Sequence, residues 1–437
     1  MNVKLIPLKD VCNAAKATEK KDDPGMIVKN QCTVILNVVL FILLTTVIAG
    51  QACANDRTQA KRIYDRLAGV VPSAAVLDSM EALIATGNHD DAVSAAYIAM
   101  NNKNFYNTTL VNWITPWTNE ARAIFPEDME TEGTLNDFTA TVIGAIRDDI
   151  DFRRILYDNI MYKGKDSLGL PAYSDSNNAH YKALEERSGL DLSQDLVPEN
   201  EAIQSAINSA LPVNAISGVL TSRAAAKAFF VAGTNRAMTR FTMLNFLCKD
   251  MNEINDVTLP SDRIRQDVSR SPGGDSRIFM NSCIGCHTGM DPMTQAFAYY
   301  DYSETTNKLV FTDGVVQPKN LINSDNFKPG YIVPDDHWVN YWRQGKNSLL
   351  NWDLSLPASG QGASSMAKEL SHSEQFARCQ VEKVFKAVCL HPPLNSADRT
   401  AVNDILAKFK LPFKKASGAG YELKRVFAET AVYCKGQ

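Results

Sequence analysis

Residues 277–288 read RIFMNSCIGCHT and combine a helical pattern with a cluster of cysteine and histidine. The sequence PGG at 272–274 breaks the chain just before this stretch, so we expect the stretch itself to be helical. Cys283 and Cys286 lie three positions apart, and His287 follows directly. On one helical turn, two thiols at this spacing can each reach a vinyl group of a porphyrin while the histidine lies under the iron. The stretch therefore predicts one covalent haem c, attached through Cys283 and Cys286 and ligated by His287.

Two other readings of the motif are weaker. A thioredoxin-type redox pair would need a strand followed by a helix, and no strand pattern precedes Cys283. Half of a zinc site is the other alternative, and the export signal described below favours haem over it. The small Gly285 between the cysteines also suits a loop that lies against a porphyrin.

The N-terminus indicates export. Residues 33–50 read TVILNVVLFILLTTVIAG, Lys29 precedes them, and Ala-Cys-Ala at 52–54 has the small-x-small form of a cleavage site. We therefore interpret residues 1–54 as a signal peptide, with Met26 as a second possible start, and expect a periplasmic or extracellular protein. An apolar run of about 18 residues also just reaches the span of a bilayer core, so an uncleaved membrane anchor remains the alternative.

Export changes how the nine cysteines are read. Three precede the predicted mature part, and four remain besides the two of the motif: Cys248, Cys379, Cys389 and Cys434. An even number in an oxidising compartment favours disulfides. Cys379 and Cys389 are ten residues apart on one expected helix, about 15 Å, so they cannot bridge each other. Cys248 should pair with one of them and Cys434 with the other. A zinc site that includes His391 is the less favoured alternative.

The fold class expected from the pattern is mainly α. The chain has 437 residues, 45% of them hydrophobic, which is enough for a sizeable core. We divide it into a signal peptide and four regions: a helical N-terminal domain at 55–215, a haem-binding domain at 216–301, a loop-rich excursion at 302–361 and a C-terminal helical module at 362–437. The haem domain is expected to be helical and c-type cytochrome-like.

Hydrophobic periodicity supports this division. A stripe of helical period runs through DFTATVIGAIRDDIDF at 137–152, and apolar residues pattern three helices after residue 375. Ser396 stands where an N-cap would precede the second of these helices. In the excursion, residues 308–311 and 315–317 flank Asp-Gly at 313–314, so we expect at most one small β-hairpin there.

The chain resembles a family of poorly characterised exported cytochrome modules first noticed in planctomycete proteins. The resemblance rests on residues 218–222, 234–236, 240–248, 283–287, 291–292 and 297–301, and on a C-terminal block from 362–366 through 376–381 to 388–389. It covers about half of the chain, and 139–157 is also similar. Phe241 and Met293 depart from the family's glycines. The resemblance implies haem binding and no particular reaction.

Arg236 and Arg240 lie one turn apart on an expected helix and could pair with haem propionates, because planar guanidinium groups suit carboxylates. The alternative for each is an ordinary ion pair. We include Arg240 among the predicted cofactor-binding residues.

Met366 is the predicted sixth ligand of the iron. Met290 and Met293 follow His287 too closely to reach the opposite face of a porphyrin. The long excursion lets the chain travel round to residues 360–366, where methionine would also favour a higher potential. The alternatives are His372 as the ligand, no protein ligand at all, or Met366 as a core residue.

The function expected is electron transfer by an exported mono-haem cytochrome, with an unidentified redox protein as its partner. A mature chain of about 380 residues is larger than one haem requires, so a peroxidase or oxidative enzyme with an open distal site, or a structural or sensor subunit, stays open. Whether the protein is an enzyme is thus undecided, with electron transfer favoured. A formal net charge of −4 gives no reason to expect nucleic acid, and membrane contact is expected only if residues 1–54 stay attached.

Overall fold

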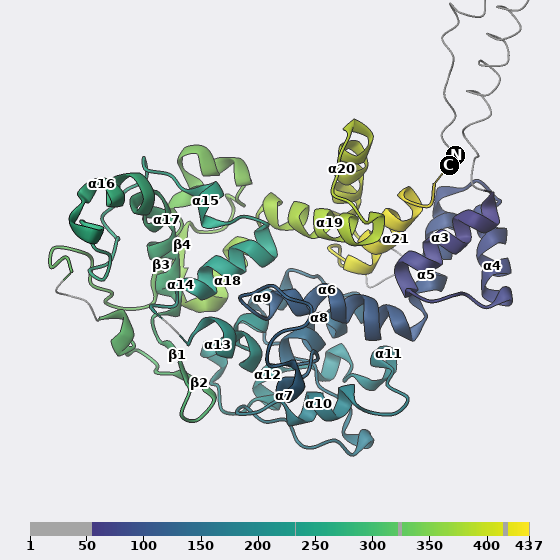
Figure 1. The fold of residues 1–437 in the computed structure, drawn as a ribbon, viewed down its shortest axis with the longest axis horizontal. Helices are drawn as coiled ribbons and strands as arrows, with labels where there is room; N and C mark the ends of the chain where they lie inside the picture. Colours follow the sequence, from purple (N-terminus) through teal and green to yellow (C-terminus); the bar gives the residue numbers. More distant parts are fainter. Residues whose placement is uncertain (1–54, 232, 322–325, 414–417, 437) are drawn as a thin grey trace, which may run out of the picture. The chain divides into compact units, whose positions relative to one another are not determined.

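Helices make up most of the described chain, which in this computed structural model comprises residues 55–436 without 232, 322–325 and 414–417 (Figure 1). The predicted signal peptide at 1–54 lies outside these residues. Within the described ranges, no helix is both long enough and apolar enough to cross a bilayer. The expectation of a mainly α protein is confirmed. The described residues from 55 onward form one compact unit.

Three helices open the described chain and pack on one another: α3 (Asp56–Ala68), α4 (Ala74–Ile84) and α5 (His89–Met100). Each begins at a polar residue whose side chain accepts a hydrogen bond from a backbone N–H of the first turn, namely Asn55, Ser73 and Asn88. Such caps fix where a helix can start, since the first N–H groups otherwise lack partners.

The expected stripe at 137–152 forms α8 (Asp137–Arg147), whose residues from 137 to 146 are all buried. The shorter helices of this part of the chain are α6 (Val111–Ile114), α7 (Met129–Glu132), α9 (Arg154–Tyr157), α10 (Ala179–Glu185), α11 (Leu192–Asp195) and α12 (Gln204–Ile207). α8 packs on α6, α9 and α11, and also on α13 (Arg223–Phe229) and α21 (Leu423–Tyr433) from later in the chain.

The region of the motif is also helical. It contains α13 (Arg223–Phe229), α14 (Arg236–Thr242), the π-helix η7 (Met243–Leu247), α15 (Met251–Ile254), α16 (Ser276–Ile278), the π-helix η9 (Phe279–Cys283) and α17 (Ile284–Thr294). The helix predicted for 277–288 is thus confirmed, but it is built from α16, η9 and α17 in succession. α17 packs on α14, which brings Arg236 beside the motif.

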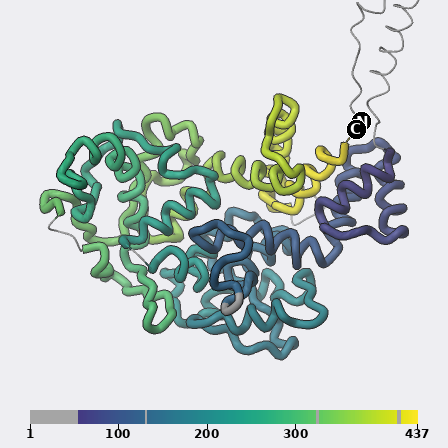
Figure 2. Tube along the Cα trace, viewed as in Figure 1, coloured from purple at the N-terminus to yellow at the C-terminus, as the bar shows by residue number. Residues whose placement is uncertain are grey.

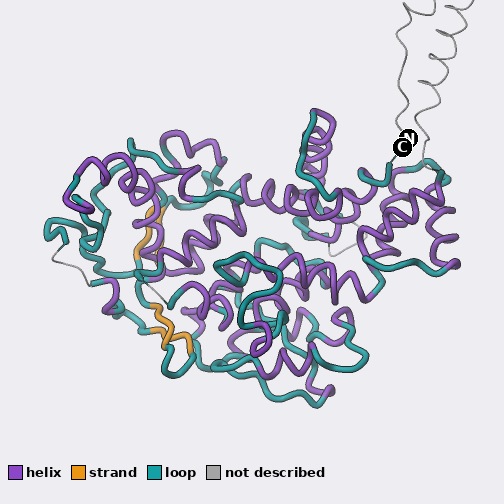
Figure 3. Tube along the Cα trace, viewed as in Figure 1, coloured by secondary structure: helices purple, strands orange, loops and turns teal. Residues whose placement is uncertain are grey.

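The strands differ from the expectation. Residues 308–311 do form a strand, β2, but its partner is β1 (Tyr300–Ser303) and not residues 315–317. A second antiparallel pair joins β3 (His337–Val339) to β4 (Ser359–Gln361), so the expectation of at most one hairpin is wrong (Figure 3). Alternate residues of β1, Tyr300 and Tyr302, are buried, which explains why that strand is selected.

The last four helices of the described chain are α18 (Gly362–Ser371), α19 (Glu374–Cys389), α20 (Ser396–Lys410) and α21 (Leu423–Tyr433). α19, α20 and α21 are the three helices that the periodicity predicted. α21 packs on α5 and α3, so the two ends of the described chain lie side by side (Figure 2). One hydrophobic core extends from Ala60 to Val432.

Candidate functional site

Cys283 and Cys286 are the two cysteines of the described chain that are not in a disulfide. Cys283 ends η9, and Cys286 lies on the first turn of α17; both are partly exposed. The other four form the pairs Cys248–Cys379 and Cys389–Cys434, which is one of the two pairings that the spacing left open. The zinc alternative is wrong, because three of its four proposed ligands are sulfurs already bonded to other sulfurs.

His287 follows Cys286 on α17 and is held by a carboxylate of the same helix. Its Nδ1 lies 3.0 Å from Oδ1 of Asp291, one helical turn further on. The Asp291 side chain has no exposed surface, whereas 19% of the His287 side chain is exposed. With Nδ1 engaged by an acceptor, Nε2 is the nitrogen left with a lone pair for a metal.

Asp291 is itself fixed by several donors. Arg236 Nε donates to Oδ1 at 2.6 Å and Arg236 Nη2 to Oδ2 at 3.1 Å, while the backbone N–H of Arg265 donates to Oδ2 at 3.2 Å. Burial alone would raise the pKa of Asp291, but the Arg236 and His287 side chains hold that pKa well below its ordinary value. The carboxyl group is therefore ionised and accepts hydrogen bonds only.

Arg236 connects this carboxylate to a second one. Its Nη1 and Nη2 donate to the two oxygens of Asp267 at 2.5 and 2.9 Å. Arg236 is thus fully engaged by Asp291 and Asp267, so the ion-pair alternative is confirmed for this residue. Arg236, Asp267, His287 and Asp291 form what we call the proximal cluster.

The other side of α17 is fastened to the protein by close packing. A Cβ on Gly285 would lie 3.2 Å from Asn255 Cβ, and the Asp256 N–H donates to the Gly285 carbonyl at 2.7 Å. A Cβ on Gly289 would lie 2.0 Å from Nε1 of Trp342. Contacts within the chain therefore require glycine at 289, whereas Gly285, between the cysteines, is closely packed but has room for small shifts.

The tryptophans of the excursion are core residues. Trp338 and Trp342 are almost fully buried. Trp338 Nε1 donates to Ser365 Oγ at 2.7 Å, and Trp352 Nε1 donates to the Trp342 carbonyl at 3.0 Å. These contacts fasten β3 and its flanking turns against α17 and α18.

Arg240 lies near Cys286 at the surface. Its guanidinium donates to both oxygens of Asp250, at 3.1 and 2.8 Å, and 48% of its side chain is exposed. Burial and the Asp250 carboxylate raise the pKa of the Cys286 thiol. The expected role of Arg240 toward a propionate remains a prediction.

Arg265 is a buried arginine that the sequence did not single out. Its Nη1 donates to the Thr234 carbonyl at 3.1 Å and to Asn320 Oδ1 at 3.0 Å. Its Nε and Nη2 have no hydrogen-bond partner among the described residues. Burial and the neighbouring Arg236 lower the pKa of Arg265 to about 10. Arg265 is only 1% exposed, so these two donors lie within the protein beside the proximal cluster, whereas Arg240 is at the surface.

Met366 is fully buried in α18, which packs chiefly on α9 and on the 3₁₀ turn η10 (Gln295–Phe297). This environment favours the alternative reading of Met366 as a core residue, and its role as an iron ligand stays a prediction. Met290 and Met293 are buried on α17 itself. His372 follows α18, and its Nδ1 bonds the Lys368 carbonyl at 2.8 Å, which leaves Nε2 available.

The sequence carried a signal for Asp291 but none for Arg265. The spacing of His287 and Asp291, four residues apart on a helix, places the two side chains on one face. Arg265 lies in a loop and reaches Thr234 and Asn320 only through the tertiary fold. No family model, curated protein or solved structure matches this chain in comparison. The resemblance to exported cytochrome modules therefore stays a prediction from the sequence segments given above.

Proposed function

We propose that this protein is an exported c-type cytochrome that carries one covalent haem and transfers electrons to a partner protein. The observation that carries the proposal is the pairing state of the cysteines. Four of the six in the described chain are joined in disulfides, and the two left free are those of the C-x-x-C-H motif. Each free thiol can add its S–H across one vinyl group, forming a thioether without a leaving group.

The residues around the motif fit such a group. His287 is oriented by Asp291 so that Nε2 remains for the iron. Apolar side chains close to the motif are exposed: Val257 at 60%, Ile278 at 44% and Met280 at 55%. A flat apolar ligand would remove such surface from water. When bound, haem supplies a one-electron couple whose potential the protein tunes.

The disulfides support the export part of the proposal. Disulfides persist in oxidising compartments and are rare in the cytosol, so two of them favour a periplasmic or extracellular location. In such a compartment the two motif thiols would form a disulfide with each other unless they were bonded to another group. Their use for haem attachment is consistent with the location.

A denaturing gel stained for haem peroxidase activity tests the proposal. The purified full-length protein should keep its haem after denaturation, and Cys283→Ala together with Cys286→Ala should remove the stain. The double variant Cys389→Ala with Cys434→Ala is the matched control, because it deletes two cysteines far from the motif and should keep the stain. Wild-type protein without covalent haem would contradict the proposal.

A haem enzyme is the second candidate, and one observation favours it. The acceptor for Nδ1 of His287 is a buried carboxylate rather than a neutral carbonyl, which makes the imidazole a stronger electron donor. Carbon monoxide separates the candidates. Rapid binding to the reduced protein, seen as a shifted Soret band, indicates an open distal site and favours the enzyme. An unchanged spectrum favours electron transfer through a six-coordinate haem.

A further inference from the structure

We infer that Asp291, clamped by Arg236, is a positioning residue that fixes the orientation of His287 and lowers the reduction potential of the bound haem. This inference rests on the proposed function and adds to it. It concerns two residues, Asp291 and Arg236, whose effect on the haem would pass through His287. The observation behind it is the chain of contacts from His287 to Asp291, Arg236 and Asp267.

The orientation follows from how completely Asp291 is fixed. Both of its oxygens are engaged, Oδ1 by His287 and Arg236, and Oδ2 by Arg236 and the backbone of Arg265. Its side chain has no exposed surface, so water does not compete for the acceptor sites. A carboxylate held in this way leaves His287 one favourable rotamer and one favourable tautomer, with the proton on Nδ1.

The effect on the potential follows from charge. A carboxylate acceptor draws the Nδ1 proton and increases the electron density that Nε2 donates, which stabilises oxidised iron over reduced iron. Arg236 limits this effect, because its positive guanidinium offsets part of the negative charge of Asp291 while it also pairs with Asp267. The two residues should therefore act on the potential in opposite directions: loss of Asp291 raises it, and loss of Arg236 lowers it.

A purely structural role predicts something different. Asp291 also holds the loop at Arg265, so its replacement could merely loosen that loop. Loosening changes stability but gives the two replacements no reason to shift the potential in opposite directions. The sign of the two shifts is thus the discriminating readout.

The experiment is a redox titration of full-length holoprotein by absorption spectroscopy. Asp291→Asn should retain covalent haem and favour the reduced state at least tenfold, which is about 59 mV for a one-electron couple. Arg236→Gln should shift the titration to lower potential. Asp250→Asn is the matched control, since it removes the same charge near Cys286 without touching His287, and its shift should be several-fold smaller.

Three outcomes are informative. Shifts of opposite sign that exceed the control support the inference. An Asp291→Asn shift no larger than that of Asp250→Asn overturns it, while the haem stain of the wild type still upholds the proposed function. If neither variant incorporates haem, NMR of the reduced wild-type holoprotein labelled with ¹⁵N-histidine tests the inference instead. A slowly exchanging Nδ1 proton on His287 supports it, and rapid exchange of that proton with solvent overturns it.

Discussion

Gly289 shows at the scale of one residue how tightly the motif helix is seated. An alanine there would place a methyl carbon 2.0 Å from Nε1 and 2.3 Å from Cε2 of Trp342, a ring that is 1% exposed and cannot swing away. Overpacking of this kind costs about 1–3 kcal/mol or more, which exceeds the ~1 kcal/mol that alanine gains over glycine in a helix. Gly289→Ala should therefore lower the free energy of unfolding, measured by denaturant titration.

Gly285 provides the comparison on the same helix. The nearest atoms to an added Cβ there are at 3.2 and 3.3 Å, a contact that small shifts can relieve. Gly285→Ala should change the free energy of unfolding by less than about 1 kcal/mol, because propensity and crowding offset each other. Equal stability of the two variants would contradict the packing described for Trp342.

What the sequence reveals at this scale depends on the distance between partners. The C-x-x-C-H motif was readable from the sequence, and helical spacing with an even count predicted that the four other cysteines form two disulfides without a Cys379–Cys389 bond. Which of the two remaining pairings forms was not predictable, because it depends on the tertiary fold. The contact between His287 and Asp291 is also local, at four residues on one helix. Arg236 was recognised as a candidate, but its two carboxylate partners lie 31 and 55 residues away, so its role required the tertiary structure.

At the scale of elements, a largely buried carboxyl group, that of Asp149, lies just after the end of α8. Asp149 follows the helix with a left-handed φ of 52°, and 13% of its side chain is exposed. Lys424 of α21 lies 2.7 Å from its Oδ2. Burial, aided by the negative charges of Glu422 and Asp148, raises the pKa of Asp149 to about 6, although Lys424 opposes the shift.

This raised pKa predicts the sign of a pH effect. In the unfolded chain an aspartate titrates near pH 4, so between about pH 4 and 6 the folded protein binds the proton more tightly. Asp149 therefore contributes stability below pH 4 that is lost as the pH rises through 6. The loss is on the order of 3 kcal/mol. The unfolding free energy of wild type minus that of Asp149→Asn should fall over this window, measured by denaturant titration at several pH values. A constant difference would contradict the assignment.

The boundaries and partners of elements were harder to predict than their type. α19, α20 and α21 were expected from periodicity, but the predicted N-cap of α20, Ser396, is wrong. The N-cap is Asn395, whose side chain accepts a hydrogen bond from the Asp398 N–H, and Ser396 is the first residue of the helix. Ser396 and Asn395 are both good caps, and only the backbone conformation selects between them. Likewise, β2 was predicted, but the turn signal Asp-Gly at 313–314 led to the wrong partner, residues 315–317. The strand pairs with β1, because that pairing buries Tyr300 and Tyr302.

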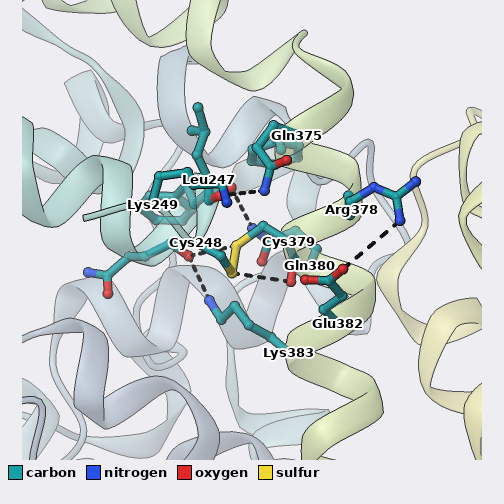
Figure 4. The surroundings of a disulfide bond; sticks show 12 residues. Leu247, Cys248, Lys249, Gln375, Arg378, Cys379, Gln380, Glu382 and Lys383 are labelled. Carbon is teal, nitrogen blue, oxygen red and sulfur yellow. Dashed lines mark hydrogen bonds and ion pairs between the residues drawn. A yellow bond between two sulfur atoms is a disulfide. The ribbon is translucent and has the colours of Figure 1, made fainter. Parts of the chain in front are cut away.

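At the scale of the whole molecule, α19 joins the motif region to the C-terminal helices. The π-helix η7 ends at Leu247, and its C-cap Cys248 has a left-handed φ of 53°. The last carbonyls of η7 accept hydrogen bonds from side chains of α19 (Figure 4). Lys383 Nζ donates to the Asn245 carbonyl at 2.7 Å, Gln380 Nε2 to that of Phe246 at 3.0 Å and Gln375 Nε2 to that of Leu247 at 2.8 Å.

Lys383 extends this junction to the N-terminal region. Its Nζ lies 3.0 Å from the centroid of the Trp117 ring, and Asn245 Nδ2 donates to the Trp117 carbonyl at 2.9 Å. Residues from three distant parts of the chain thus meet beside the Cys248–Cys379 disulfide. The hydrophobic core that extends from Ala60 to Val432 includes Trp117 and Phe246 of this junction.

The two disulfides should therefore contribute differently to stability. Cys248–Cys379 closes a separation of 131 residues and Cys389–Cys434 one of 45, so the loop-closure model gives about 5 and about 4 kcal/mol. Replacing each pair by serines should lower the unfolding free energy in that order, measured by denaturant titration of the oxidised protein. The contacts of Gln375, Gln380 and Lys383 should keep α19 on η7 without the disulfide. Haem attachment should then persist in both variants. Loss of the covalent haem stain in Cys248→Ser with Cys379→Ser would show that these contacts alone do not hold the junction.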